Sequence, residues 1–385
     1  MKCEAFTNAI KKTYKVVRNK YFLCVALSLP FLMAASNGLG RRSHFHHRDQ
    51  TGGITLGAYY FDGWSIAKSA HLTPKLRDSF PDRKPKWGWI TSTPEAMKDQ
   101  IDLAADAGLS FFSFDWYYPD YDHQHFREDP LNHALSLYLA APNKDRLKFC
   151  LLISNHAGQE IGPSDWPAVT DEWVRLFGQS GYLQVAGNPY IAFFDLRSLI
   201  RLFGSKDAVH QAMDALRSKA RQAGQPGVTI AACVSPNAQA VQEAKDCGFD
   251  MVTGYNYPNP GYRNQLMQYH VDSLASFGKY VWNKFHHTDL PYIPVATLNW
   301  DPRPWANGNN WYSKATRFNG YNANTVYKAV RALSDWINNN PGDTPSDRIG
   351  LLYAWNEYGE GAWLTPSEND TLHLLSGVKR ALSHQ

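Results

Sequence analysis

Cysteine is scarce in this sequence. The 385 residues include five cysteines, of which Cys3 and Cys24 lie in the N-terminal segment. The other three, Cys150, Cys233 and Cys247, are odd in number and follow no spacing pattern. A disulfide framework is therefore excluded as the basis of the fold, although a single Cys233–Cys247 bridge stays open. Cys150 and Cys233 lie in apolar runs, where a free cysteine acts as a small buried side chain, and we assign no chemistry to the cysteines.

The folded part of the chain has no excess of charge of either sign. The formal net charge of +4 comes from residues 1–35, which contain six basic residues and one acidic residue. The rest of the chain carries 33 basic and 34 acidic residues. A nucleic-acid surface needs a basic excess, so we expect no nucleic-acid partner. A Gly-rich dinucleotide-binding fingerprint is also missing after the first predicted strand.

Long hydrophobic runs are missing as well. The apolar stretch at 21–35 is shorter than the roughly 20 residues that a membrane-spanning helix needs, and it contains Pro30. It follows a basic region and ends in small residues, which is typical of a secretory signal peptide. We predict a signal peptide at 1–36, with an uncleaved signal anchor as the alternative, a polar linker at 37–53 and one folded domain at 54–385. Export to the periplasm or the extracellular space is the expected localisation, with membrane contact only through an uncleaved leader.

No set of side chains has the spacing of a metal site. His44, His46 and His47 lie together in the linker, but no cysteine or carboxylate accompanies them, which favours a polar tail. His156 follows a predicted strand without a second histidine or cysteine at ligand spacing, so a hydrogen-bonding role is favoured over a metal-binding one. We expect neither a metal nor a cofactor.

What the sequence does contain is a regular alternation of strand-like and helix-like segments. Strands are predicted at 54–61, 110–114, 147–154, 190–194, 228–234, 251–254, 292–298 and 349–354. Helices are predicted at 94–107, 130–140, 168–179, 206–223, 238–247, 265–282, 324–339 and 371–382. Eight strand–helix units without a compositional break predict a closed (β/α)8 TIM barrel, a single α/β domain. A doubly wound open sheet is the alternative.

The last predicted strand leads directly into two carboxylates. The apolar run at 349–354 is followed by Trp355, Asn356, Glu357 and, three residues further, Glu360. If the turn is helix-like, Glu357 and Glu360 share a face, with about 5–6 Å between their Cβ atoms. Aromatic neighbours around paired carboxylates suit a sugar, which offers an apolar face and a rim of hydroxyls. The alternative for each glutamate is a solvated loop residue or a charge at a helix N-terminus.

Polar and aromatic residues follow nearly every other predicted strand. The carboxyl ends of barrel strands face one rim, so these residues are expected to line one cavity. The predicted substrate-binding residues are Tyr60, Asp62, Trp64, Asp115, Trp116, Asn155, His156, Asp195, Tyr255, Asn256, Asn299, Trp300, Asp301 and Asn356. This set lacks a phosphate-binding signature and suits a neutral polyol. Alternatively, Asp62, Asp115 and Asp195 cap the segments that follow them.

Four motifs carry a family resemblance: YYFDGW at 59–64, FFSFDWYY at 111–118, NWDPRPW at 299–305 and AWNEYGEGAWLTP at 354–366. With them, residues 54–383 resemble the glycoside hydrolase family 99-like proteins, which include the WbsX-type proteins of polysaccharide gene clusters. In the endo-α-mannosidases of family 99 the two glutamates of W-N-E-x-x-E are the catalytic pair. The matching residues here are Glu357 and Glu360.

The resemblance implies an unusual retaining mechanism. Glu357 would act as the base on the sugar's own 2-hydroxyl to give a 1,2-anhydro sugar, and Glu360 would be the acid/base. The usual retaining route instead makes one glutamate a covalent nucleophile. The family's mannosidases carry a histidine inside the W-N-E-x-x-E element, where this chain has Tyr358 and Gly359. The resemblance therefore does not extend to mannose specificity.

The expected function is that of an exported glycoside hydrolase of neutral α-linked glycans, with an oligosaccharide or polysaccharide as the substrate. Two alternatives stay open, a non-catalytic glycan-binding barrel and a WbsX-like glycosyltransferase of polysaccharide synthesis. Endo or exo action, the sugar and the oligomeric state also stay open at this stage.

Overall fold

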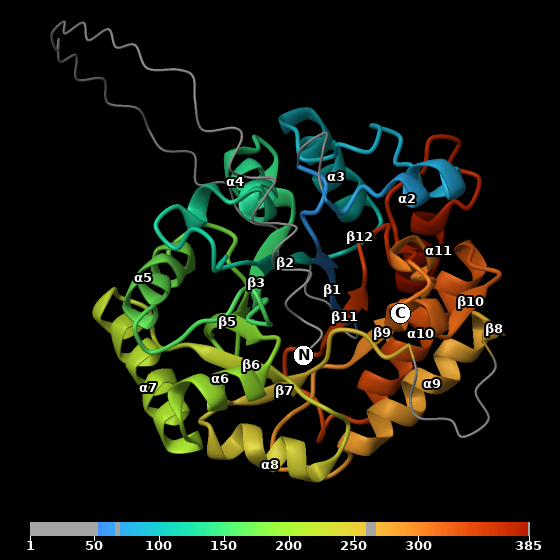
Figure 1. Cartoon of the computed structure of the whole chain (residues 1–385). Coiled ribbons are helices and arrows are strands. Elements are labelled where there is room, and N and C mark those ends of the chain that lie inside the picture. Colours follow the sequence, from blue (N-terminus) through green and yellow to red (C-terminus); the bar gives the residue numbers. More distant parts are fainter. Residues whose placement is uncertain (1–52, 66–69, 259–266, 384–385) are drawn as a thin grey trace, which may run out of the picture. The chain divides into compact units, whose positions relative to one another are not determined.

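In the computed structural model, the eight apolar runs of the sequence form parallel strands arranged as a barrel (Figure 1). The strands are β1 (Thr55–Tyr60), β2 (Phe111–Trp116), β3 (Lys148–Ile153), β5 (Asn188–Phe193), β6 (Thr229–Cys233), β7 (Met251–Thr253), β9 (Val295–Thr297) and β11 (Ile349–Tyr353). They pair in the order β7-β6-β5-β3-β2-β1-β11-β9. A parallel bridge between Val252 and Tyr292 connects β7 to the segment before β9 and nearly closes the ring. The predicted (β/α)8 barrel is confirmed.

The structure describes residues 53–65, 70–258 and 267–383. The predicted signal peptide at 1–36 and nearly all of the predicted linker, including its three histidines, lie outside the described residues. Residues 54–385 form one compact unit. Within the described ranges, none of the helices has both the length and the apolar character needed to cross a membrane.

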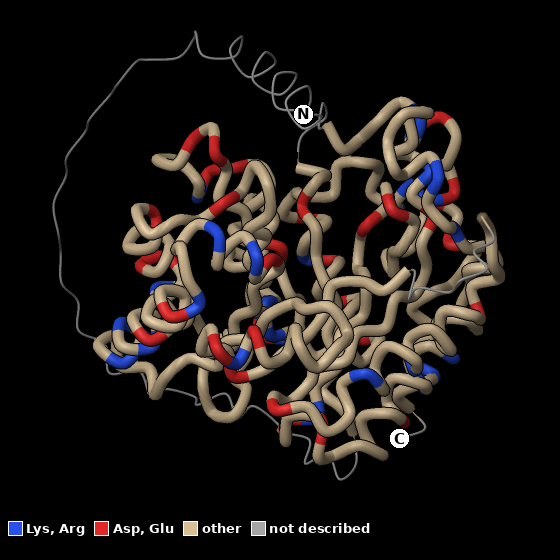
Figure 2. The backbone as a smooth tube through the Cα atoms, turned by 60° about the horizontal axis from the view of Figure 1, so that its bottom comes forward, with Lys and Arg blue, Asp and Glu red and all other residues tan. Residues whose placement is uncertain are grey.

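Helices surround the strands (Figure 1). Those that follow the barrel strands are α3 (Pro94–Asp106), α4 (His133–Ala140), α5 (Trp166–Phe177), α7 (Lys206–Gln222), α8 (Ala238–Asp246), α9 (Asp272–Trp282), α10 (Ala323–Asn339) and α11 (Leu374–Ser383). The predicted cap of α3 is confirmed, because the Thr93 side chain accepts a hydrogen bond from the Ala96 N–H. Basic and acidic residues are interspersed along the outer helices (Figure 2), and ion pairs such as Lys206–Asp246 join neighbouring helices.

Two segments differ from the prediction. The helix predicted at 265–282 begins only at Asp272, because residues 268–270 form strand β8 (Gln268–His270), which pairs in parallel with β10 (Arg317–Asn319). Pairing with a distant segment overrides the local helical pattern. A further helix, α6 (Leu196–Phe203), follows β5 directly, and the Asp195 side chain caps it by accepting from the Arg197 and Ser198 N–H groups.

Alternate residues of the first two strands face opposite sides. Tyr59 points into the barrel, where its hydroxyl donates to the Gly254 carbonyl at 2.6 Å. Tyr60 packs against Phe112 and Phe114 on the other side. Phe114 in turn contacts Tyr138 of α4, so this set faces the helices. The period of two therefore decides which residues near a strand end can reach the mouth of the barrel.

Candidate active site

The two glutamates sit in a short hairpin that follows the last barrel strand. Its strands are β12 (Asn356–Glu357) and β13 (Ala362–Trp363), which pair antiparallel. The turn between them is not helical, but the Glu360 N–H donates to the Glu357 carbonyl at 3.2 Å, which keeps the two residues close. Gly361 has φ of 76°, a conformation that glycine adopts at little cost. The hairpin thus replaces the helix-like turn on which the sequence argument depended.

Glu357 belongs to a buried chain of hydrogen bonds. Its Oε1 accepts from the Tyr255 hydroxyl at 2.8 Å, and the same hydroxyl lies 2.7 Å from Asp115 Oδ2. Asp115 and Glu357 are only 4% and 6% exposed. A phenol carries one proton, so it fully donates to one carboxyl, and the other can hydrogen-bond only if it is protonated. The geometry therefore favours a state in which one of the two carboxyls, Asp115 or Glu357, is protonated and the other is ionised.

Burial is the main reason why the pKa values of these acids are raised. It raises the pKa of Glu357 well above its usual value, and the charges of Glu360 and Asp115 raise it further. Burial also raises the pKa of Asp115, while the hydrogen bond from Tyr255 opposes the shift. Glu360 accepts a hydrogen bond from the Tyr353 hydroxyl, and burial raises its pKa to about 7. Burial thus favours the protonated form of Glu360.

Aromatic rings surround the three acids. The Tyr255 ring lies 5.0 Å from Tyr59, 5.4 Å from Phe194 and 4.8 Å from Tyr353, between ring centroids. Tyr117 is close enough that the charges of all three acids contribute to its raised pKa, after burial. In the described part of the chain, Asp115, Glu357 and Glu360 form no ion pair with a lysine, arginine or histidine. The negative charge of these acids is therefore reduced by protonation and stabilised by hydrogen bonds from tyrosine hydroxyls.

Five other predicted site residues lie around this cluster. Trp300 contacts the Tyr353 ring at 6.4 Å, and Asn256 lies in hydrogen-bonding contact with the Tyr353 side chain. His156 lies between the Tyr117 and Phe194 rings. Asn299 donates to the Gly361 carbonyl at 2.6 Å. The structure thus brings together Asp115, His156, Tyr255, Asn256, Asn299, Trp300, Glu357 and Glu360.

Two of these residues present unused acceptors. Asp115 Oδ1 and Asn299 Oδ1 are buried and have no hydrogen-bond partner within the described ranges. A buried acceptor without a partner costs free energy, and such groups gather where a ligand supplies the missing donor. A sugar hydroxyl is a suitable donor.

Asp301 is held in an ion pair. Arg83, which is 5% exposed, reaches Asp301 Oδ2 at 2.5 Å, and Arg303 binds the same carboxylate at 2.7 Å. Arg83 also donates to the Tyr358 carbonyl at 2.9 Å, so the pair ties the β9 loop to the hairpin. Asp301 supports the site and is not among the three acids of the cluster.

The other carboxylates and amides from the predicted set hold the backbone. Asp62 accepts from Ser92 and from the Ala134 N–H at the start of α4, and burial raises its pKa to about 7. Asn155 exchanges two hydrogen bonds with the Asp195 backbone, at 2.8 and 2.9 Å. The capping alternative describes the contacts of Asp195. Asp62 instead binds the start of a helix that is distant in the sequence, and Asp115 caps nothing.

Three aromatic residues of the predicted set lie away from the acids. Tyr60 and Trp116 face the helices, because they share the outer side of their strands with Phe112 and Phe114. Trp116 packs against Trp173 of α5 at 5.6 Å. Trp64 is fully buried and its indole N–H donates to the Asn356 carbonyl at 3.0 Å. None of the three contacts the acidic cluster.

Asn356 links the segments that follow β1 and β11, two neighbouring strands of the barrel. Its amide accepts from the Phe61 N–H at 2.9 Å and donates to the Phe61 carbonyl at 2.7 Å. We expect Asn356→Ala to lower the free energy of unfolding by about 2–4 kcal/mol, since both buried Phe61 groups lose their partner. Denaturant unfolding measures the loss, and Asn324→Ala, at an exposed position of α10, is the matched control with a change within about 0.5 kcal/mol. An equal effect of both substitutions contradicts this role.

The sequence argument missed three tyrosines. Burial raises the pKa values of Tyr117, Tyr353 and Tyr312, and the nearby charges of the two glutamates raise them further. Tyr117 is two residues after Asp115 and so shares its face of the strand, a signal that the period of two contains. Tyr353 is the last residue of β11 and is predictable in the same way. Tyr312 lies in a loop, and no local pattern points to it.

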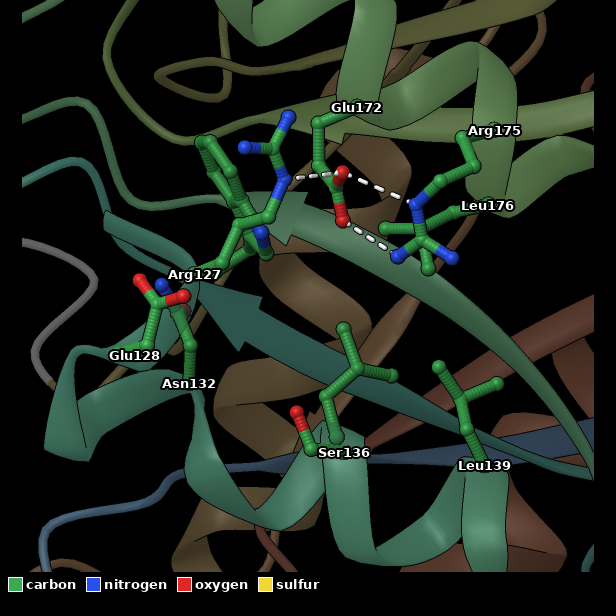
Figure 3. Close-up of a pocket in the computed structure, with 10 residues that line it drawn as sticks. Arg127, Glu128, Asn132, Ser136, Leu139, Glu172, Arg175 and Leu176 are labelled. Carbon is green, nitrogen blue, oxygen red and sulfur yellow. Dashed lines mark hydrogen bonds and ion pairs between the residues drawn. The ribbon is translucent and has the colours of Figure 1, made fainter. Parts of the chain in front are cut away.

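A cavity on the outer side of the barrel is separate from this cluster. It has a volume of about 270 Å³ and lies between α4 and α5, where Arg127 and Arg175 hold the buried Glu172 (Figure 3). Trp116 lines it from the outer face of β2, whereas Asp115 projects from the inner face. The described residues contain no group of three or more histidines, cysteines or acids that could hold a metal ion.

A family model confirms the resemblance noted in the sequence. The model described as "Glycosyltransferase WbsX" matches residues 88–377, which is most of the chain. The chain belongs to the WbsX family. None of the curated proteins matches it. The match to this WbsX-family chain includes the second, third and fourth motifs and both glutamates of the hairpin.

Solved structures show the same fold. The WbsX-family chain is similar to a family 99 endo-α-mannosidase from Bacteroides thetaiotaomicron, with 15% identity over 86% of this chain and 96% of the mannosidase and a TM-score of 0.58. It is also similar to a glycoside hydrolase-like protein, with 14% identity over 92% and 97% of the two chains and a TM-score of 0.58. The chain therefore has a glycoside hydrolase fold of the family 99 type.

Proposed function

We propose that this WbsX-family chain is a retaining glycoside hydrolase that acts on neutral α-linked glycans. The observation that carries the proposal is the arrangement of Glu357 and Glu360. They occupy one turn at the carboxyl end of the barrel, where Glu357 is buried and Glu360 is partly buried. They bind different tyrosine hydroxyls and have no basic partner in the described structure. Two such acids with separate environments suit the two proton transfers of glycoside hydrolysis.

The roles are those that the family resemblance implies for the two glutamates of W-N-E-x-x-E. Tyr255 donates to Glu357, which lowers the pKa of Glu357 against the raising effect of burial and favours the ionised form that a base needs. Glu357 takes the proton of the sugar's 2-hydroxyl while that oxygen attacks the anomeric carbon. Glu360, with a pKa raised to about 7, gives its proton to the departing glycosidic oxygen. Water then opens the 1,2-anhydro sugar: Glu360 takes a proton from the water, and Glu357 returns one to O2.

The surroundings favour a neutral sugar. Three acids in one cluster disfavour an anionic substrate, because another buried negative charge adds repulsion. The unused acceptors of Asp115 and Asn299 suit sugar hydroxyls, and the tyrosine rings suit an apolar pyranose face. A hydrolysis screen over neutral α-linked oligosaccharides tests the proposal, with the first-formed anomer detected by proton NMR. We expect turnover with the α anomer as first product, and a β product or no turnover contradicts it.

The activity is expected to depend on pH through Glu360. The acid must be protonated, and a carboxyl with a pKa of about 7 loses its proton as the pH rises through that value. We expect kcat/KM to fall about tenfold per pH unit above pH 7 and to level off below it until Glu357 becomes protonated. The measurement is kcat/KM between pH 4 and 9. A profile that stays flat above pH 7 contradicts the role of Glu360 as the acid.

The family description favours one other candidate, a glycosyltransferase. A transferase would bind a sugar nucleotide and release the nucleotide when an acceptor glycan is added. Calorimetric titration with uridine- and guanosine-diphosphate sugars distinguishes the two, since we expect no binding for a hydrolase.

We also propose that the chain is exported through its N-terminal leader. Mass spectrometry of the N-terminus after expression tests this, and a start near residue 37 in the exported fraction is the expected result.

A further inference from the structure

Trp311 has the most exposed large hydrophobic side chain of the described residues, at 61%. It lies in a 3-10 turn, η7 (Trp311–Lys314), in the loop that leads from β9 to α10 at the carboxyl end of the barrel. Exposing an indole to water is unfavourable in the free protein, so a ligand that covers it gains free energy.

A row of rings connects Trp311 to Glu360. The Tyr353 hydroxyl donates to Glu360, and the Tyr353 ring lies 6.4 Å from Trp300. Trp300 lies 6.2 Å from Trp311 at an interplanar angle of 19°, and the Tyr312 ring is 4.2 Å from Trp311. Tyr312 senses the charges of both glutamates, which contribute to its raised pKa. The row thus begins at the acid and ends in solvent.

The loop that carries Trp311 is held by its own side chains. Asn310 Nδ2 donates to the Trp305 carbonyl at 2.7 Å. Ser313 Oγ accepts from the Gly308 N–H at 2.9 Å and donates to Asn310 Oδ1 at 3.1 Å. Because the loop is fixed before a ligand arrives, little conformational entropy is lost when the indole binds.

We propose that Trp311, supported by Trp300, forms a sugar-binding subsite on the leaving-group side of the candidate active site, where the indole stacks on a neutral pyranose ring of the glycan. The inference rests on the proposed function, in which Glu360 gives its proton to the departing oxygen. The departing part of the glycan then lies beside Glu360 and Tyr353, and the row of rings leads outward from there. The apolar face of a pyranose covers the exposed indole, and the substrate is a chain that extends past the scissile bond.

Binding to oligosaccharides of increasing length tests the subsite. Glu360→Gln is the background, so that the glycan is not consumed, and a printed array of neutral α-linked oligosaccharides identifies the series for calorimetric titration. We expect Trp311→Ala to raise the Kd for the longer members about tenfold and to leave the shortest unchanged. Trp311→Phe keeps an aromatic face and stays within about threefold. Tyr280→Ala is the matched control, because Tyr280 is also exposed, at 46%, but lies on α9.

Hydrolysis of an α-glycosyl fluoride separates this inference from the proposed function. Its leaving group is a fluoride ion, which offers no ring to stack on the indole, so Trp311→Ala in the otherwise native chain should lower kcat/KM for the fluoride by less than for the longer glycans. Equal affinities of Trp311→Ala and its parent at every length overturn the subsite, and so does a parent that binds no glycan on the array. A dimer in sedimentation that Trp311→Ala dissociates also overturns it, because a second copy then covers the indole. Trp311-dependent binding without hydrolysis of any glycan keeps the subsite and rejects the hydrolase.

Discussion

Replacing Glu360 or Glu357 with glutamine is expected to lower kcat/KM by at least about 10³-fold. The glutamine at 360 cannot give a proton to the departing oxygen, and the glutamine at 357 cannot take one from the 2-hydroxyl. Each general acid–base step contributes about 10²–10⁴-fold, and in this site the two steps belong to one reaction. Initial rates on the best glycan from the screen give the ratio, and calorimetry should show that both variants still bind that glycan within about tenfold.

A substrate with an activated leaving group separates the two roles. An aryl glycoside with a good leaving group needs little protonation, so it should restore much of the rate of Glu360→Gln and none of that of Glu357→Gln. Thermal unfolding at pH 8 controls for damage to the fold. Because burial raises the pKa of Glu360 from 4.5 to about 7, the folded state loses stability as the pH rises between these two values, and the full loss is present at pH 8. The Glu360→Gln variant should therefore unfold at the same or a higher temperature than the native chain, and a large fall contradicts the argument.

We expect Tyr255→Phe to lower kcat/KM by about 10²–10³-fold. The hydroxyl that links Asp115 to Glu357 is removed, and two buried carboxyls are left without the group between them. Since the hydrogen bond from Tyr255 lowers the pKa of Glu357, its loss should move the acidic limb of the pH profile to higher pH. A positioning defect alone would lower the rate without moving that limb.

Two variants complete this test. If Glu357 is the ionised partner of Tyr255, Asp115 is the protonated one, and Asp115→Asn keeps a donor to the hydroxyl. We therefore expect Asp115→Asn to stay within about tenfold of the native chain and Asp115→Ala to lose more. Tyr182→Phe is the matched control, because it removes a buried hydrogen bond of 2.9 Å to the Tyr190 carbonyl outside the cluster. If Asp115→Asn lowers kcat/KM as much as Tyr255→Phe does, Asp115 acts in its ionised form and the argument is contradicted.

The barrel was predictable because each strand is a short continuous apolar run that can be recognised without knowing its partner strands. Each run is bounded by polar residues, and the spacing between runs leaves room for one helix. The β8–β10 pair was not predictable, since its partners are separated by a long stretch of chain and residues 268–270 carry no strand pattern of their own. The helix α6 is not among the predicted helices, although the capping alternative for Asp195 implies that a helix begins there.

The acidic cluster was predictable in part. Asp115, Glu357 and Glu360 follow or end strands, so their meeting at one rim follows from the barrel. The prediction that Trp116 lines the rim placed it on the wrong side of its strand, because β2 extends to residue 116 and alternation continues to its end. One partner of Asp301, Arg83, is far away in the chain and could not be predicted, whereas Arg303, two residues after Asp301, was a local signal for an ion pair.

The position of β11 has a consequence for how the protein is made. This strand is the last of the barrel to be synthesised, and it fits between β1, the first, and β9. The hairpin with both glutamates follows it directly. Almost the whole polypeptide must therefore be synthesised before β11 can pair with β1 and β9. A chain truncated before Ile349 lacks both this strand and the hairpin that carries the two glutamates. The two glutamates therefore reach their final positions only when the barrel closes.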